Sequence, residues 1–485
     1  MQWVQIVCYR LEQWQRILLK VLKVPFKIGK NEKDLHYIED KGKVMNKPLL
    51  LFQGPVRSRS GYGDHTRDII ISLFKMDKFD IRIGATTWGD CPETGLDNNN
   101  PHHTQIANKI LTSNQLEKQP DVYINCSVPN EWGQHGKYNI GITAGIETTV
   151  CDTSWIEGCN KMDLIIVPSV HSKNVLMNSV YDKVDNKTKK KVGELKLEKP
   201  IEVLFEGLDT LTYKLLTTPI QTIDDELKNI DEDFCFLYVG HWLNGKMGHD
   251  RKDTGMMIKT FCESFKNSKI KPALILKTSS ATFSIMDRND MLRKIRGIRQ
   301  GFGDNAPNVY LLHGDLTPEE MNGLYNHPKV KAHISFTKGE GFGRPLLEAS
   351  VSEKPVIASN WSGHVDFLHP DYTTLLPGQL KPVHKSAQWK NVINEGSQWF
   401  YVDYKIAQTV LRDVYNSYDN YIPLAKEQTK YSNSKFSMES MDSLFKDLIE
   451  KYVPEAPEQV SINLPQLKKV GSSKPKLTLP KLKKV

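Results

Sequence analysis

Residues 336–350 read FTKGEGFGRPLLEAS, a glycine-rich turn between a short apolar run and a segment with helical character. The apolar run 332–336 predicts a strand, and Pro345 suits the first turn of the helix that follows. Backbone N–H groups at the N-terminus of such a helix favour an anion, and a diphosphate fits there. Three residues of the turn would present those N–H groups: Gly341, Phe342 and Gly343.

Two carboxylates belong to the same turn. Glu340 lies in the loop, and Glu348 lies about one turn into the predicted helix. A carboxylate accepts hydrogen bonds from neighbouring hydroxyls through both of its oxygens. A nucleotide sugar, which has phosphates in its middle and hydroxyls at both ends, would use the whole segment. The alternative is a tight strand-to-helix turn whose glutamates are favoured only by the helix dipole.

The turn belongs to a long alternation of apolar runs and helical stretches, which predicts parallel sheets covered by helices. A polar break near 206–232 divides this alternation into two halves of similar size. We therefore expect two doubly wound α/β domains that face a cleft, with ligands at the carboxyl ends of the strands. The predicted strands are 48–52, 79–83, 121–125, 138–142, 164–168, 202–205, 234–239, 273–277, 308–313, 332–336, 355–359 and 373–376.

The segment 336–350, with Glu340 and Glu348, resembles the E-x7-E signature of retaining GT-B glycosyltransferases, those of glycosyltransferase family 4 in particular. The resemblance extends to GDLTPEEMNGLY at 314–325 and to KPVIASNWSGH at 354–364. It is clear over 234–370 and looser over 47–210. It implies a GT-B fold of two Rossmann-like domains. It also implies retaining transfer of a hexose-type sugar from a nucleotide-sugar donor to a glycan, lipid or protein acceptor.

The resemblance also implies roles for individual residues. Glu340 would contact the donor sugar and Glu348 the ribose. The family places an arginine and a lysine on the donor diphosphate, after the first strand of the second domain. Here His241 stands where the arginine is usual, and an apparent insertion precedes Arg251 and Lys252. Lys252 is matched to the family's lysine, and Arg251 is the candidate substitute for the arginine. A solvated surface pair is the alternative.

The first half offers two further candidate positions. The segment GPVRSRSGYGDHT at 54–66 follows a predicted strand, and its Gly61 and Gly63 match the family's glycine-rich loop. A simple tight turn would also explain those glycines. Glu147 follows another strand, where the family often has a residue that faces the acceptor, although it could equally be a turn carboxylate. Glu340 and Glu147 are thus the predicted catalytic residues.

The sequence predicts no metal site and no cofactor apart from the donor. The Asp-x-Asp at 231–233 lies in a polar stretch before a strand, and the cysteine and histidine pairs lack the spacing of metal ligands. In the family, front-side attack assisted by the leaving diphosphate is favoured. The protein would then act by positioning and charge stabilisation.

The 485-residue chain carries a net charge of +8, and this charge is concentrated at its ends. Residues 1–30 carry +5 and residues 459–485 carry +7, which leaves the stretch 31–458 at −4. A globular body that binds nucleic acid by its own face should be basic. Nucleic acid is therefore a less favoured partner than a membrane surface or an acidic protein.

Residues 1–30 have the apolar spacing of an amphipathic helix, which could pack on the main body or lie in a membrane interface. The tail repeats LPQLKKV (464–470) as LPKLKKV (479–485), which is typical of a disordered segment with a short motif. No secretory signal is visible, so the cytoplasm is the expected location, with peripheral attachment to a membrane as an option. No apolar run is long enough to span a bilayer.

The predicted organisation has six parts. They are a basic extension and linker (1–46), an acceptor domain (47–205), an interdomain linker (206–232), a nucleotide-sugar domain (233–396), C-terminal helices that pack back across the domains (397–454) and a disordered basic tail (455–485). Two other functions stay open. One is a GT-B scaffold that docks a partner through its tail, and the other is a glycosyltransferase that modifies nucleic acid.

Overall fold

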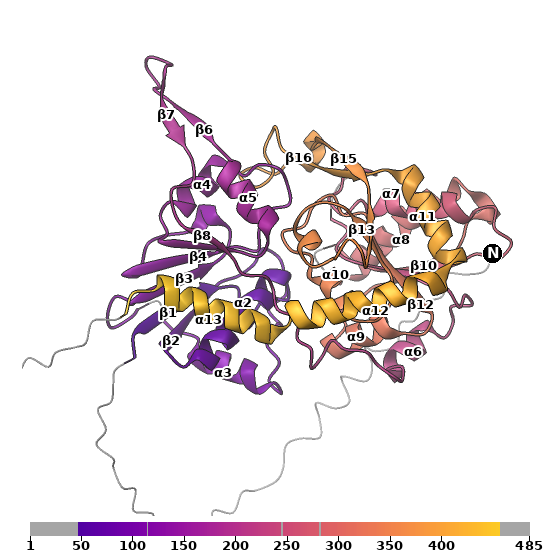
Figure 1. The fold of residues 1–485 in the computed structure, drawn as a ribbon, viewed down its shortest axis with the longest axis horizontal. Coiled ribbons are helices and arrows are strands. Elements are labelled where there is room, and N and C mark those ends of the chain that lie inside the picture. Colours follow the sequence, from indigo (N-terminus) through magenta and orange to yellow (C-terminus); the bar gives the residue numbers. More distant parts are fainter. Residues whose placement is uncertain (1–46, 114, 244–245, 281–282, 456–485) are drawn as a thin grey trace, which may run out of the picture. The chain divides into compact units, whose positions relative to one another are not determined.

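The computed structural model describes residues 47–455, apart from positions 114, 244–245 and 281–282. The predicted N-terminal helix and the repeated tail motif therefore lie outside the described residues. Within the described part, two six-stranded parallel sheets form the frame of the structure (Figure 1).

The first sheet has the strand order β2-β1-β3-β4-β5-β8. Parallel neighbours need a crossover connection, and helices supply most of those connections. The strands are β1 (Leu49–Gly54), β2 (Asp80–Ala85), β3 (Val122–Cys126), β4 (Tyr138–Ile142), β5 (Leu164–Val167) and β8 (Ile201–Val203). The helices are α2 (Gly61–Met76), α3 (Pro101–Lys109), α4 (Thr153–Cys159) and α5 (Val170–Asn178).

The second sheet has the order β11-β10-β9-β12-β13-β14, so the direction of winding reverses between β9 and β12. Ligands of doubly wound folds bind outside the carboxyl ends of the strands at such a reversal. The strands are β9 (Cys235–Val239), β10 (Ala273–Lys277), β11 (Val309–Leu312), β12 (Val330–Ser335), β13 (Val356–Ser359) and β14 (Thr374–Leu376). The helices are α6 (Gln221–Leu227), α7 (Thr254–Phe265), α8 (Ile285–Gln300), α9 (Pro318–Asn326), α10 (Arg344–Ala349) and α11 (Tyr404–Asn416).

Every predicted strand overlaps an observed one, and the predicted fold class of two doubly wound α/β halves is confirmed. Three features differ from the predicted elements. The region after residue 397 begins with a strand, β16 (Gln398–Val402), which pairs with β15 (Gly378–Pro382) in an antiparallel hairpin. The predicted linker 206–232 contains α6, whose Ile223 and Leu227 are buried one turn apart. A second hairpin, β6 (Tyr181–Val184) and β7 (Lys191–Leu195), projects from the first half (Figure 1).

The reason for the β16 strand is its composition. QWFYV at 398–402 is rich in aromatic and β-branched residues, which favour a pleated surface. Trp399, Phe400 and Val402 are buried, because this strand covers the second half rather than continuing a helix. Short 3₁₀ helices complete the described part at Pro129–Glu131, Gly303–Asn305, Gly363–Asp366 and Lys385–Ala387.

Two long helices, α12 (Tyr418–Lys435) and α13 (Met438–Tyr452), carry the chain from the second half back to the first (Figure 1). Gln428 of α12 bonds to backbone of the second half, where its amide nitrogen donates to the carbonyl of Phe367 at 2.7 Å. Met441, Phe445 and Ile449 of α13 belong to the apolar core of the first half, which includes Leu50 and Ile69. Residues 438–452 therefore complete a core that begins at residue 49.

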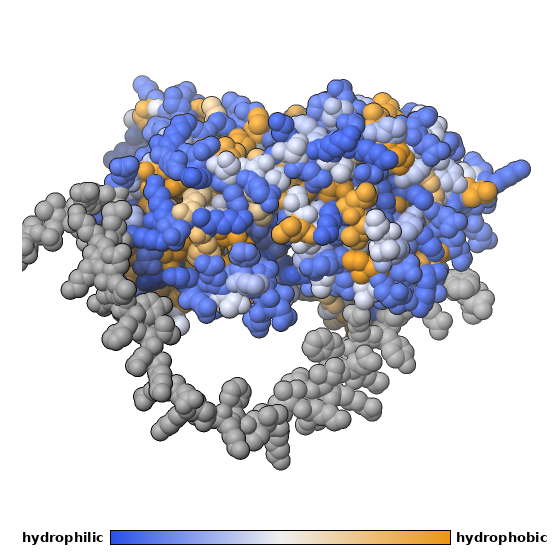
Figure 2. All heavy atoms as spheres, turned by 60° about the horizontal axis from the view of Figure 1, so that its bottom comes forward, coloured by the Kyte–Doolittle hydropathy of each residue, from blue (hydrophilic) through white to orange (hydrophobic). Residues whose placement is uncertain are grey.

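Apolar side chains are mostly collected in the interior clusters of the two halves. Figure 2 shows the complementary surface, on which hydrophilic residues predominate and apolar residues form small scattered patches. Among the described residues, no helix combines the length and the apolar character that crossing a membrane requires.

Candidate active site

Loops that follow three parallel strands converge on one cluster of charged side chains. Glu340 follows β12, Arg251 and Lys252 lie in the long loop after β9, and Glu147 lies in the loop after β4. β9 and β12 are the two strands between which the second sheet reverses its winding. The fold therefore brings these residues to the edge where a doubly wound domain binds its ligand.

Glu340 is the centre of this cluster and is only 7 % exposed. Its Oε2 accepts a hydrogen bond from Arg251 Nη1 at 3.0 Å, and its Oε1 accepts one from Lys252 Nζ. Its backbone N–H donates to Ser362 Oγ at 2.9 Å, which fixes the loop. Burial would raise the pKa of Glu340, but the charges of Lys252 and Arg251 outweigh it and hold the pKa below its usual value.

Arg251 links the two halves of the molecule at this point. Its Nη1 also donates to the carbonyl of Gly339 at 2.9 Å and lies 3.7 Å from Glu147 Oε1. Burial would lower the pKa of Arg251, but Glu147 and Glu340 together raise it. Four residues proposed from the sequence thus meet in space: Glu147, Arg251, Lys252 and Glu340.

Glycine is required in the signature loop because the loop touches the first half at backbone distance. A Cβ at Gly341 would lie 2.0 Å from the carbonyl oxygen of Ala144, and one at Gly339 would lie 2.0 Å from that of Glu147. Ser169 Oγ donates to the carbonyl of Gly341 at 2.6 Å across the same contact. No side chain fits between these loops, so only glycine allows the closed arrangement.

Gly343 and Phe342 have structural functions in the same turn. Gly343 precedes α10 with φ 103°, a left-handed conformation that glycine adopts without strain. The side chain of Phe342 is buried and packs against Phe367, with 5.0 Å between ring centroids. It therefore anchors the turn in the core of the second half.

Glu348 lies in a second charged cluster, which is centred on Arg344. Arg344 Nη1 donates to Asp68 Oδ2 at 2.6 Å, and its Nε lies 3.4 Å from Glu348 Oε1. Tyr325 Oη donates to Glu348 Oε2 at 3.1 Å, and Glu206 Oε2 lies 3.9 Å from Arg344 Nη1. Burial raises the pKa of Glu348 to about 7, although Arg344 opposes the shift. This carboxyl can therefore both donate and accept near neutral pH.

Gly61 and Gly63 lie at the start of α2, the helix that carries Asp68. Ser60 caps this helix, because its Oγ accepts from the backbone N–H of Gly63 at 3.2 Å. A Cβ at Gly63 would lie 2.1 Å from the carbonyl oxygen of Ser58, whereas one at Gly61 would meet open space. Asp68, further along the same helix, belongs to the Arg344 cluster.

Lys338 is a residue of the site that the sequence reasoning did not assign. It is fully buried, and its Nζ donates to the carbonyls of Gly248 at 2.7 Å and Asp250 at 2.9 Å. It also lies 3.1 Å from Asp253 Oδ1. Its backbone N–H donates to the carbonyl of Arg251 at 2.8 Å. Lys338 therefore holds the loop that carries Arg251 and Lys252 against the signature turn.

Arg344 is also absent from the sequence-based site, although it stands within the quoted signature. Its position in the sequence could have drawn attention to Arg344. A cation at the start of α10 is unfavourable with respect to the helix dipole, so a nearby anion is expected to compensate it. Its partner carboxylates come from distant segments, which is why the reason for its charge is visible only in the structure. Within the described residues, no three histidine, cysteine, aspartate or glutamate side chains are grouped to hold a metal ion.

No family model matches the chain, and curated protein sequences give no match. Solved structures do match. HepE of Anabaena, crystallised with UDP-glucose, aligns with 83% of this chain and 100% of its own at a TM-score of 0.53 and 12% identity. The fold is GT-B.

Two further solved structures share this fold with the chain, each at 12% identity. Sucrose-phosphate synthase of Thermosynechococcus elongatus covers 84% of this chain and 98% of its own at a TM-score of 0.54. A glycosyltransferase of Rickettsia africae aligns with 85% of this chain and 100% of its own at a TM-score of 0.55. The coverage spans both halves of the GT-B fold.

Proposed function

We propose that this protein is a retaining glycosyltransferase that transfers a hexose-type sugar from a nucleotide-sugar donor to a glycan, lipid or protein acceptor. The observation that carries the proposal is the cluster of Glu340, Arg251 and Lys252 at the reversal point of the second GT-B sheet. A doubly wound sheet takes its ligand at this point, and two partly buried cations there suit a diphosphate.

The two cations would serve the leaving group. In the structure Arg251 and Lys252 neutralise Glu340. When a donor binds, its diphosphate would take over these cations, and Glu340 would be released towards the hydroxyls of the sugar. Charge that develops on the diphosphate as the glycosidic bond breaks would then meet fixed positive groups, which is a large source of transition-state stabilisation.

The remaining carboxylates have separable roles. Glu348, beside Tyr325 and Arg344, would accept from the ribose hydroxyls. Glu147 enters from the first half and would face the acceptor beside the transferred sugar. The acceptor hydroxyl would attack the face that the diphosphate leaves, so the configuration of the sugar would be retained without a covalent enzyme intermediate. No metal is assigned a role.

UDP-glucose is the first donor to test, because HepE, which shares the fold, was crystallised with it. Other nucleotide sugars complete the panel, and release of the free nucleotide is measured with and without acceptor extracts. We expect Glu340→Gln to lower the rate by about 10²–10³-fold, because a neutral amide replaces the carboxylate that would accept from the sugar hydroxyls. Glu395→Gln, an exposed loop change, is the matched control. Addition of EDTA should leave the rate unchanged.

Three outcomes would contradict all or part of this proposal. Failure of every nucleotide sugar to bind would exclude a transferase and favour a scaffold. Wild-type turnover by Glu340→Gln would remove the proposed site. Inversion of the anomeric configuration in the product would overturn the retaining mechanism alone.

A further inference from the structure

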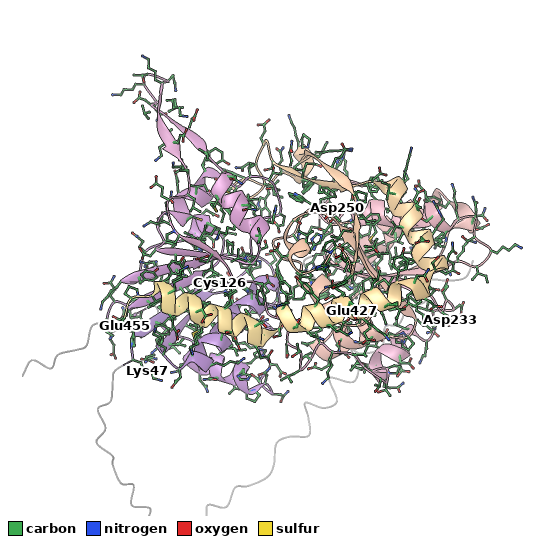
Figure 3. The ribbon with its side chains drawn as sticks, in the orientation of Figure 1. Lys47, Cys126, Asp233, Asp250, Glu427 and Glu455 are labelled. Atoms are coloured by element: carbon green, nitrogen blue, oxygen red, sulfur yellow. The ribbon has the colours of Figure 1, made fainter. Side chains whose placement is uncertain are left out.

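A cavity of about 670 Å³, widely open to solvent, lies in the second half between the loop after β9 and the β15–β16 hairpin. Figure 3 labels Asp250, which lies close to this hairpin and follows the lining residues Met247, Gly248 and His249. The opposite wall is formed by the hairpin and the start of α11. Its lining residues are Lys381, Pro382, Val383, His384, Lys385, Tyr401 and Tyr404.

The cavity is positively charged. Lys381 and Lys385 line it, and within the described residues no carboxylate forms a salt bridge with either of them. Asp250 and Asp253 follow the lining residues of the β9 loop but are buried and do not line the cavity. Asp253 is already neutralised by Lys338 at 3.1 Å and accepts from Tyr404 Oη at 2.5 Å. An anionic group in this cavity would therefore meet cations without a competing carboxylate.

The cavity also offers flat rings and unused hydrogen-bonding groups. The rings of His249 and His384 stack with 3.8 Å between centroids and 18° between planes. His384 Nδ1 accepts from the backbone N–H of Ser386 at 3.1 Å, which leaves its Nε2 for another partner. His249 Nδ1 is buried and has no hydrogen-bond partner among the described residues. A buried polar atom without a partner is costly unless a ligand or a water supplies the bond.

We propose that this cavity binds a sugar that carries a phosphate or a carboxylate group. The volume suits a small ligand, and sites for such ligands combine apolar walls with a few well-placed polar groups. Lys381 and Lys385 would hold the anion, Nε2 of the exposed His384 would bond to a hydroxyl, and the ring of Tyr401 would face the apolar side of the sugar. Lys381 Nζ already lies 5.5 Å from the centroid of that ring.

The cavity is separate from the donor cations but shares a loop with them. Gly248 and His249 line the cavity, and Arg251 and Lys252 of the same loop contact Glu340. Lys338 binds the loop between them at the carbonyls of Gly248 and Asp250. The cavity is therefore a second ligand site, distinct from the proposed donor site, and the transfer reaction proposed above does not require it.

Titration calorimetry with glucose 1-phosphate and glucuronate tests this proposal, and glucose is the uncharged control. We expect saturable binding of at least one of the two anionic sugars and at least tenfold weaker binding of glucose. The double variant Lys381→Gln/Lys385→Gln should weaken binding of the anionic sugar at least tenfold. Lys390→Gln, which removes an exposed lysine outside the cavity lining, should leave it unchanged.

A further variant distinguishes the cavity from the donor site. Lys252→Gln should leave binding of the anionic sugar unchanged if the cavity holds it. Loss of binding in Lys252→Gln with retention in the double variant would place the probe at the donor cations and overturn the proposal. Binding of glucose as strong as that of the charged sugars, or no binding of either charged sugar, would overturn it as well. Because the readout is binding, it does not depend on transferase activity.

Discussion

Glu340 is a buried anion that balances two partly buried cations, and these neighbours explain why it stays ionised. Removing a charge from water is costly, and a pair of this kind persists only when its geometry satisfies each partner. Arg251 and Lys252 do so by contacting different carboxylate oxygens. In the proposed reaction the diphosphate of the donor would displace Glu340 from both of these cations.

The Arg344 cluster has more negative than positive groups, because one arginine faces two buried carboxyls, Glu206 and Glu348, and the partly buried Asp68. Burial raises the pKa of Glu206 to about 8, an effect that Arg344 opposes and Asp68 reinforces. Burial also raises the pKa of Asp68, against the effect of Arg344. Near neutral pH, Glu206 is therefore held mostly in its protonated form.

This shift gives the protein a pH-dependent stability. The folded protein binds a proton at Glu206 that the unfolded chain releases above its ordinary pKa of about 4.5. The stabilisation is therefore fully present below about pH 4.5 and is lost as pH rises towards 8, at up to ~1.4 kcal/mol per pH unit. We expect Glu206→Gln to flatten the fall in unfolding free energy between pH 5 and 8, measured by urea denaturation.

Glu395→Gln, on the surface, should reproduce the wild-type pH profile. Parallel profiles for wild type and Glu206→Gln would show that Glu206 titrates at its ordinary pKa, and would exclude this explanation.

At the scale of elements, the strands were predictable and the additions to the two sheets were not. Apolar runs bounded by polar turns located every strand of both sheets, because buried parallel strands read as continuous apolar segments. The β15–β16 hairpin and α6 were missed, because their burial depends on neighbours distant in sequence. Trp399 of the hairpin, for example, is buried against the cation of Lys338, 5.2 Å from its ring centroid.

The candidate site was predictable to a similar degree. The signature glycines and glutamates stand together in the chain, so their grouping could be read directly. The pairing of Arg251 and Lys252 with Glu340 depended on a long loop whose path follows from the buried contacts of Lys338. A sequence shows that Lys338 is a lysine and does not show that its charge points inward to two carbonyls and Asp253.

The turn between β12 and α10 keeps its close contact with the loop after β4 only if no side chain separates the two backbones. We expect Gly341→Ala to force the loop away from Ala144, whose carbonyl oxygen would lie 2.0 Å from the new Cβ. The unfolding free energy should fall by about 1–3 kcal/mol. Transfer activity should fall by more than the loss of folded protein accounts for, because Glu340 moves with the loop. Urea denaturation and nucleotide release measure the two effects.

Gly297→Ala is the matched control, because a Cβ at Gly297 meets nothing within 4 Å and the residue lies inside α8. Alanine there should raise the unfolding free energy by about 0.5–1 kcal/mol. Equal stability and activity in Gly341→Ala and wild type would mean that the two loops separate in solution.

At the scale of the whole molecule, α13 is part of the first half although it comes last among the described elements. Its buried Met441, Phe445, Leu448 and Ile449 join the core of residues 49–204. Each such side chain contributes about 1.5–3 kcal/mol by burial. Truncation after Lys435 should therefore abolish the cooperative unfolding of the first half while the second half keeps its own transition.

Calorimetry and binding of a hydrophobic dye would report this loss. Truncation after Glu455, which keeps α13, is the control and should leave both transitions unchanged. A folded first half in the shorter truncation would show that strands β1–β8 and their helices are sufficient without α13.

The chain passes between the two halves twice, and both passages lie side by side. Leu208, on the outward passage, donates its N–H to the carbonyl of Phe436 at 2.8 Å and accepts from the N–H of Met438 at 2.8 Å. Two adjacent crossings define a single line about which one half can swing, whereas sliding and twisting would break these bonds. A swing about that line would separate Arg59 from Asp315, a partly exposed ion pair that joins the two halves at 3.1 Å. Such an opening would also part the contacts across the signature loop, including Ser169 with Gly341 and Arg251 with Glu147, while the pivot stays intact.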